Sequence, residues 1–189
     1  MSRGFVVQAR SREMIRRLAE SIRQTLSLEA RQVPIVDVLE KVWPKLYADF
    51  DFQVYDPIDM EAEFGPGTYG VTLQVGDTII LREDVYARAQ EGMARDRFTV
   101  AHELGHYLMH RGEGFAMPQR SAIEVPYFRD SEWQANTFAA EFLVDTKNLL
   151  QLGLDNLQDI RHAFGVSYKT ASIQLTMAKK MAIKELELR

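Results

Sequence analysis

The stretch R-F-T-V-A-H-E-L-G-H-Y-L-M-H, residues 97–110, decides how the rest of the chain is interpreted. It places His102 and His106 four positions apart, so on a helix both imidazoles lie on one face and can reach one metal ion. Glu103 lies about 100° further round such a helix, within reach of a water molecule on that ion rather than of the ion itself. The stretch therefore predicts a helix, from about residue 96 to 110, that carries two metal ligands and a general base.

Two observations decide whether this pattern is accidental. With four His and fifteen Glu in 189 residues, an H-E-x-x-H match arises by chance in on the order of one chain in a hundred. The neighbours of the motif are apolar, so Glu103 would be buried between two histidines at a high free-energy cost unless a cation lay beside it. A metal site is therefore favoured over an ordinary helix.

The third ligand has to come from another part of the chain. His110 lies about 12 Å along the helix axis from His102, too far to share an ion with it. The residues after His106 also lack the glycine and third histidine of the metzincin extension. A set of two histidines and one glutamate is a known solution for catalytic zinc, so a glutamate is sought elsewhere.

A second predicted helix, residues 131–144, offers two glutamates for this role. Glu132 and Glu141 lie about 180° apart round the helix, so only one of them can face the metal. The side that carries Glu132 has mostly small residues, which permit close helix packing and favour Glu132: Ala135, Asn136, Ala139 and Leu143. Asn136, one turn beyond Glu132, is a candidate for orienting a ligand. Lower-ranked alternatives lie in or beside the preceding loop: Glu113, Glu124 and Asp130.

The composition is that of a single soluble globular domain, with 46% hydrophobic and 26% charged residues. No apolar run approaches the roughly 20 residues needed to cross a membrane, and the N-terminal apolar stretch is too short for a secretory signal. We therefore expect a cytoplasmic protein with no membrane partner. The absence of cysteine excludes disulfides, thiolate metal sites and a cysteine nucleophile, so any metal must be held by histidine and carboxylate.

Charge is segregated along the chain, although the net charge is only −4. Residues 1–33 carry seven Arg and three Glu, and residues 161–189 carry six basic and two acidic residues, so each segment is +4 and residues 34–160 are −12. An acid-rich tract runs from Asp49 to Glu63. The simplest interpretation is a solvated face, and the alternative is that the acidic middle prefers a basic protein segment as substrate or partner.

Hydrophobic spacing predicts the remaining elements. Helices are expected over residues 11–28 and 35–42, the second stopped by Pro44. Strands are expected at three places, the last two forming a hairpin around Gly76-Asp77: residues 52–55, 70–75 and 78–82. The irregular connection of roughly twenty residues before Ser131 is long enough to suggest a lid or the edge of a cleft.

The C-terminal half is expected to be helical. Ser131 and Gln134 stand in the relation of a capping box at the start of the helix that ends near Val144. Residues 146–187 predict two or three helices, with Gly165 separating one from the next. The expected fold is α+β, a small antiparallel sheet packed on a mainly helical domain with the histidine helix at its centre. One domain, 1–189, is divided into three parts: N-terminal helices (1–45), a core (50–145) and a helical C-terminus (146–189).

Two stretches of the sequence resemble those of a known protein family. The stretch 97–110, followed by E-W-Q-A-N-T-F-A-A-E-F-L-V at 132–144, resembles the ImmA/IrrE family of bacterial zinc metallopeptidases. The resemblance is strong from Thr78 to Val144 and weaker over the C-terminal stretch 157–175. Two residues depart from the family pattern, Gln134 where a second acidic residue is usual and Asp145 where a proline is usual. Neither is a proposed ligand, so they put in doubt helix ends and substrate contacts rather than the metal site.

The resemblance implies an activity and a partner. It places zinc ligands on His102, His106 and Glu132 and the catalytic glutamate on Glu103, which would activate a zinc-bound water and pass its proton to the leaving amine. It also implies that the chain cleaves a helix-turn-helix repressor and so derepresses mobile-element, stress or defence genes. A further oxyanion donor is usual in such sites, and the sequence leaves four candidates open: Tyr107, His110, Tyr127 and Arg129.

Two other functions compete with this one. Residues 157–175 have the pattern of a helix-turn-helix, and residues 161–184 hold five basic and no acidic residues before Glu185, which permits weak contact with nucleic acid. A DNA-binding regulator with a structural metal is therefore an alternative, although base-reading Asn and Gln are sparse there. The other is a partner-binding module whose zinc only braces the fold, and Glu103 argues against it because a structural site needs no general base.

Overall fold

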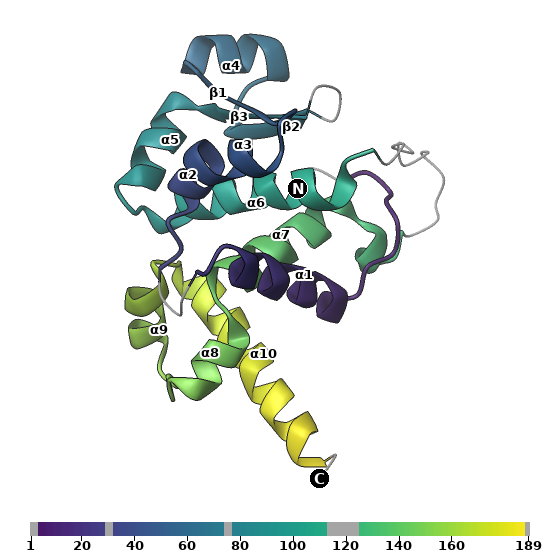
Figure 1. Ribbon diagram of the computed structural model, residues 1–189, viewed down its shortest axis with the longest axis vertical. Helices are drawn as coiled ribbons and strands as arrows, with labels where there is room; N and C mark the ends of the chain where they lie inside the picture. The colour runs from purple at the N-terminus through teal and green to yellow at the C-terminus, as the bar shows by residue number, and fades with distance from the viewer. Residues whose placement is uncertain (1–3, 29–31, 74–76, 113–124, 188–189) are drawn as a thin grey trace.

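The computed structural model describes residues 4–28, 32–73, 77–112 and 125–187. Helix α6 (Ala94–His110) lies at the centre, between a three-stranded sheet and helix α7 (Ser131–Leu143), as Figure 1 shows. Helix α1 (Arg12–Thr25) packs on α7, and the C-terminal helices lie at the end of the molecule farthest from the sheet. The α+β class is confirmed, and the histidine helix is the element around which the others are arranged.

The sheet is mixed rather than antiparallel, so that part of the prediction is wrong. Its order is β1-β3-β2, made of β1 (Asp51–Tyr55), β2 (Gly70–Leu73) and β3 (Thr78–Arg82). The predicted hairpin pairs β2 with β3 antiparallel, its turn residues 74–76 lying outside the described residues, whereas β1 pairs with β3 in parallel. The reason is that β3, with its unbroken buried run of Ile79, Ile80 and Leu81, takes the central position between the other strands.

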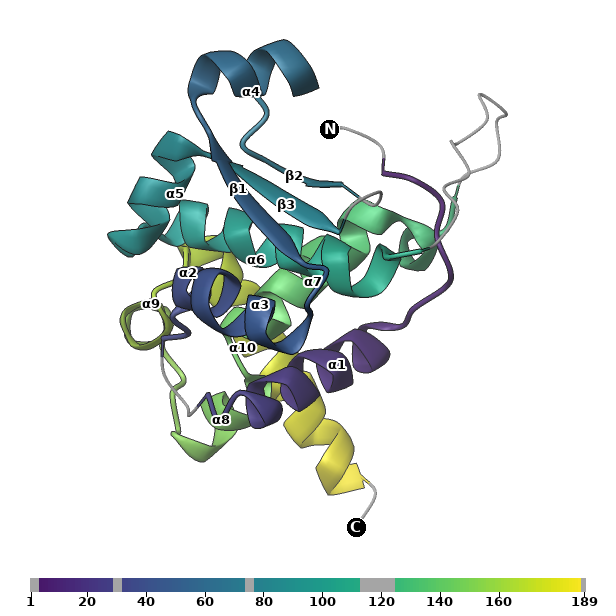
Figure 2. The ribbon, with the colours of Figure 1, turned by 45° about the horizontal axis from the view of Figure 1, so that its top comes forward.

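Two helices that the hydrophobic spacing does not predict flank the sheet. Helix α4 (Pro57–Phe64) joins β1 to β2 on the outer side of the sheet and carries three of the six acidic residues of the acid-rich tract (Figure 2). Its signal is local, because Asp56 accepts hydrogen bonds from two backbone N–H groups of the first turn and Pro57 occupies the first helical position. Helix α5 (Glu83–Gln90) follows β3 directly and packs against α6.

The second predicted helix is not stopped by Pro44. It consists of a short turn α2 (Ile35–Asp37), a π-helical turn η1 (Val38–Val42) and helix α3 (Trp43–Leu46). Pro44 lies in the first turn of α3, where a missing N–H is tolerated, and the wide π turn precedes it. Trp43, only 2% exposed, packs edge-on against Tyr107 of α6 and so holds this continuation in place.

Helix α7 begins with a different cap from the one predicted. Asp130 is its N-cap and accepts a hydrogen bond from the Trp133 N–H at 3.0 Å. Ser131 instead uses its hydroxyl oxygen to accept a bond from the N–H of Phe5, because the N-terminal segment runs beside this helix start. The capping box of Ser131 and Gln134 is therefore wrong, since a long-range contact takes the serine.

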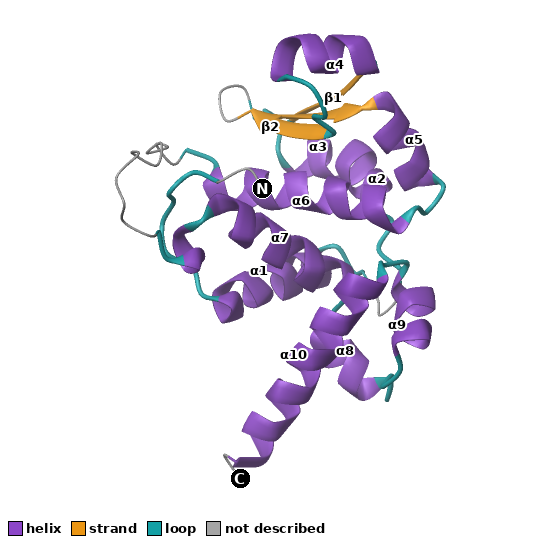
Figure 3. Cartoon of the chain, turned by 180° about the vertical axis from the view of Figure 1, so that it is seen from behind, coloured by secondary structure: helices purple, strands orange, loops and turns teal. Residues whose placement is uncertain are grey.

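The C-terminus forms three helices, as predicted: α8 (Thr146–Gln151), α9 (Leu157–Phe164) and α10 (Tyr168–Glu187). Gly165, with φ +61°, ends α9 in the left-handed conformation that favours glycine. Asp145, the departure from the family proline, caps α8 by accepting from two backbone N–H groups. Helix α10 projects beyond the body of the molecule (Figure 3). Among the described helices there is none whose length and hydropathy would let it cross a bilayer.

Candidate metal centre

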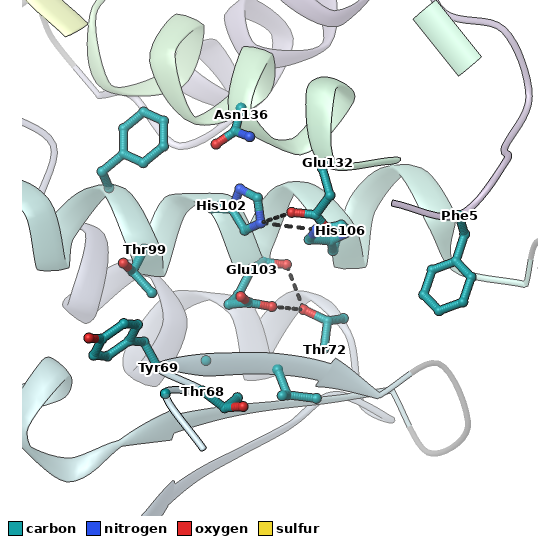
Figure 4. Close-up of a pocket in the computed structure, with 14 residues that line it drawn as sticks. Phe5, Thr68, Tyr69, Thr72, Thr99, His102, Glu103, His106, Glu132 and Asn136 are labelled. Atoms are coloured by element: carbon teal, nitrogen blue, oxygen red, sulfur yellow. Dashed lines mark hydrogen bonds and ion pairs between the residues drawn. The ribbon is translucent and has the colours of Figure 1, made fainter. Parts of the chain in front are cut away.

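Three predicted ligands converge in the structure. The Nε2 atoms of His102 and His106 lie 3.0 Å apart, and the carboxylate oxygens of Glu132 lie 3.4 and 3.3 Å from them (Figure 4). The histidines come from the middle of α6, and Glu132 comes from the first turn of α7, which packs against it. The spacing argument and the choice of Glu132 over Glu141 thus lead to one compact cluster.

The cluster fits a divalent cation. Tetrahedral ligands about 2.0 to 2.1 Å from zinc lie about 3.3 to 3.4 Å from one another, close to the distances found here. Burial lowers the pKa of the His102 ring, but the hydrogen bond to Glu132 and the charge of Glu103 outweigh burial and raise it. Hydrogen bonds from His102 and His106 hold the pKa of Glu132 well below its usual range. The surroundings therefore favour positive charge at this point, which a metal ion would supply.

A cleft opens at the His102–His106–Glu132 cluster, and Glu103, the residue after His102 on α6, also lines it. We call it the metal cleft. Glu103 is 7% exposed, and its Oε2 lies 2.8 Å from the Thr72 hydroxyl of β2. The space between β2 and α6 is too narrow for a side chain at position 70, where an added Cβ would lie 2.9 Å from Glu103 Cγ. Gly70 and Thr72 therefore hold the glutamate from one strand, since alternate residues of a strand point to the same face.

His110 supports His106 from behind. Its Nδ1 lies 3.1 Å from Nδ1 of His106, and its Nε2 lies 3.1 Å from Oε1 of Gln134. Gln134 in turn donates from Nε2 to the backbone oxygens of Gln8 and Phe128. These linked hydrogen bonds fix the orientation of the His106 ring, and so determine which of its nitrogens faces the cluster. Gln134, the second departure from the family pattern, is thus a structural partner of the site.

A match to a known family covers the metal-ligand cluster and Glu103. Residues 73–176 match the peptidase family M78, the IrrE N-terminal-like domain, and this span is more than half of the 189-residue chain. The chain belongs to this family. The ImmA/IrrE resemblance is thereby confirmed, and the His-His-Glu cluster of this family member is compatible with a metal ion. The comparison with curated proteins found no match.

The candidates for an oxyanion donor do not reach the cleft of this family member. His110 is fully buried behind His106, and Tyr107 is turned into an aromatic cluster with Trp43 and Phe50. Tyr127 is 65% exposed and packs on Trp133, outside the metal cleft. Arg129 donates from Nε to the backbone oxygen of Val7. None of the four lines the cleft in the described part of the chain, and an oxyanion role for any of them stays a prediction.

The other residues considered as metal ligands or as orienting groups lie in different surroundings. Asn136 is exposed and lines the cleft beside His102. Its role in orienting a ligand stays a prediction. Glu141 is buried on the opposite side of α7, where its Oε1 accepts from Arg12 at 2.7 Å. Asp130 caps α7, and Glu113 and Glu124 lie outside the described residues, as does most of the predicted lid.

The cleft also contains residues that the sequence-based argument missed. It has a volume of about 650 Å³, and β2 with the segment before it forms the wall opposite the cluster. The polar cleft residues that were not predicted are Thr68, Tyr69, Thr72 and Thr99. A signal for Thr72 was present, because Gly70 and Thr72 alternate on one face of a predicted strand.

Close packing of α6 on α7 brings the ligands together. A Cβ added at Gly105 would lie 3.0 Å from Phe138 Cδ1 and 3.3 Å from Ala135 Cα. We expect Gly105→Ala to destabilise the fold by about 1 kcal/mol, because overpacking, at about 1 to 3 kcal/mol, outweighs the gain in helix propensity. Displacing α7 also moves Glu132, so zinc affinity should fall about tenfold. Thermal unfolding and zinc titration measure both, and an unchanged affinity would contradict this role of Gly105.

Removing the Thr72 hydroxyl should slow catalysis without changing the affinity for the metal. Thr72→Val keeps the shape of the side chain but removes the hydrogen bond to Glu103, whose loss is worth about 1.5 to 3 kcal/mol for a charged partner. We expect kcat for peptide cleavage to fall about ten- to a hundredfold, with KM and zinc affinity unchanged. A fall in zinc affinity would show instead that Thr72 shapes the cluster itself.

Proposed function

We propose that the chain is a zinc-dependent, site-specific endopeptidase. The observation that carries this proposal is the position of Glu103, buried beside the His102–His106–Glu132 cluster and facing the same open cleft. A metal that only braces a fold needs four protein ligands and no neighbouring base. Three convergent donors with an adjacent carboxylate instead match the requirements of hydrolysis.

The residues of the chain divide the chemistry between them. A zinc ion held by the cluster would act as a Lewis acid toward a peptide carbonyl and toward water. Glu103 takes a proton from the attacking water and delivers it to the nitrogen of the leaving amine. The Thr72 hydroxyl holds that carboxylate in position. The hydrogen bonds that link His106 to His110 and His110 to Gln134 fix the ring of His106.

For the substrate we propose a helix-turn-helix repressor, so that cleavage derepresses mobile-element, stress or defence genes. Support comes from the ImmA/IrrE family likeness, and a narrow regulatory protease is consistent with a cleft whose shape is determined by a few fixed side chains. DNA binding through residues 161–184 is less favoured than peptide cleavage, because the first turn of α10 lines a cavity beside the metal cleft.

Co-expression tests this proposal. Each helix-turn-helix protein encoded near the gene is produced with the wild-type chain or with Glu103→Gln, and its intact mass is followed. We expect discrete fragments of one repressor with the wild type alone. Regulation that persists in Glu103→Gln with an intact repressor would instead support a binding module or a DNA-binding regulator.

A further inference from the structure

A second cavity opens directly beside the metal cleft. It has a volume of about 740 Å³ and lies between the first turns of α6 and α10, with α7 as its floor. Phe98, Thr99 and Asn136 line both this cavity and the metal cleft, so the two form one continuous groove. A chain segment bound across the metal site can therefore extend into it.

The charge of this cavity is opposite to that of the whole chain. Among the described residues, three basic ones and no acidic one line it, whereas the net charge of the protein is −4. Arg12 is already engaged with the buried Glu141. Arg95 and Lys169 are exposed, and within the described ranges no carboxylate lies at ion-pair distance from either. The positive ends of two long helices, α6 and α10, add to this charge.

Apolar surface lies next to these cations. Phe98 and Trp133 are partly exposed, and Ile173 of α10 is 37% exposed. The guanidinium of Arg95 lies 5.1 Å from the ring centre of Tyr69, which lines the metal cleft, so this cation stands at the junction of the two cavities. An acidic side chain followed or preceded by an apolar one complements this arrangement in both charge and hydrophobicity.

We propose that this cavity is a substrate subsite that selects an acidic residue next to an apolar one in the cleaved protein. The proposal rests on the peptidase function and adds the substrate class. A peptide is favoured over nucleic acid because the groove leads to the metal cleft and its described lining offers two cations without a carboxylate partner, whereas phosphate backbones are held by many cations.

Binding is measured separately from cleavage. A proteome-derived peptide library is passed over the zinc-loaded Glu103→Gln chain at low ionic strength, and retained peptides are sequenced. We expect enrichment of Asp or Glu beside an apolar residue, reduced about tenfold by Arg95→Glu with Lys169→Glu. The control Lys179→Glu with Lys180→Glu makes the same charge change on the exposed side of α10, outside the cavity, and should keep the enrichment. No retention, or enrichment unaffected by the first pair, overturns the subsite.

Cleavage of the same library by the wild type separates the two proposals. Acidic residues at a fixed distance from the cut support both. Cuts without any acidic preference overturn the subsite and leave the peptidase, whereas selective retention without any cut overturns the peptidase, and with it the role in substrate selection, and leaves only a groove that binds acidic peptides. A 20-nucleotide single-stranded DNA that displaces the retained peptides, and loses this ability in the Arg95 and Lys169 variant, would assign the cavity to nucleic acid and overturn the proposal.

Discussion

Replacing Glu103 by glutamine is expected to slow peptide cleavage about 10³-fold while zinc stays bound, the middle of the range for general acid–base catalysis. Glutamine has nearly the same size and can still accept a hydrogen bond from Thr72, so the cleft keeps its shape. It cannot accept a proton from water, because an amide is not a base near neutral pH. The first-order cleavage rate of the most rapidly cut library peptide, measured with saturating enzyme, gives the effect.

A matched control separates chemistry from charge. Glu91→Gln removes a carboxylate at the exposed C-terminal end of α5, away from the cleft, and should leave the rate unchanged. Zinc content per chain, measured by mass spectrometry of the metal, should equal that of the wild type in both variants. A rate for Glu103→Gln within tenfold of the wild type would show that another group removes the proton.

The second large effect is expected on zinc affinity. Structural zinc sites with four ligands bind with about 10 to 16 kcal/mol, or about 3 to 4 kcal/mol per ligand, so losing one ligand should weaken binding by roughly 10² to 10³. His106→Ala removes a ligand and also the partner of the buried His110. Competition with a fluorescent zinc chelator measures the loss, and cleavage at limiting zinc should fall with it.

Two comparisons make this test specific. His162→Ala removes an exposed histidine of α9 and should leave zinc affinity unchanged. Glu132→Ala should resemble His106→Ala, whereas Glu141→Gln should retain zinc because that carboxylate faces Arg12 on the other side of α7. Zinc binding that survives Glu132→Ala but fails in Glu141→Gln would contradict the assignment of the third ligand.

The histidine helix and its partner could be predicted because both depend on spacing within one element. Four positions along α6 place His102 and His106 together, and the small residues on one side of α7 identify Glu132 as the inward glutamate. The support from His110 had the same signal, since it stands four positions after His106. Spacing alone does not show that His110 supports His106 rather than the substrate, because its other neighbour, Gln134, belongs to another helix.

Features that depend on packing between distant segments could not be predicted in this way. The parallel pairing of β1 follows from which strand is most buried, and that is decided by helices on both sides of the sheet. Ser131 is taken by Phe5, 126 positions away, so a local cap rule fails there. Thr72 meets Glu103 only because the narrow contact at Gly70 sets the distance between strand and helix.

Counting charge along the chain gives a different substrate preference from the structure. The alternative interpretation of the acidic middle segment predicts a basic partner, yet helix α4, which carries three acidic residues of the tract from Asp49 to Glu63, lies on the outer side of the sheet, opposite α6. The groove beside the metal cleft is lined by Arg95 and Lys169, which come from different parts of the chain. Proximity to the cluster, rather than segment charge, therefore decides which substrates we expect.

The central claim is that a metal at His102, His106 and Glu132 and the carboxylate of Glu103 together hydrolyse peptide bonds. The most direct measurement sequences the new peptide ends formed from a proteome-derived library by four samples: metal-free wild type, zinc-loaded wild type, zinc-loaded Glu103→Gln and zinc-loaded Glu132→Ala. We predict cuts by the zinc-loaded wild type alone. The same cuts in the metal-free or the Glu103→Gln sample would contradict the claim.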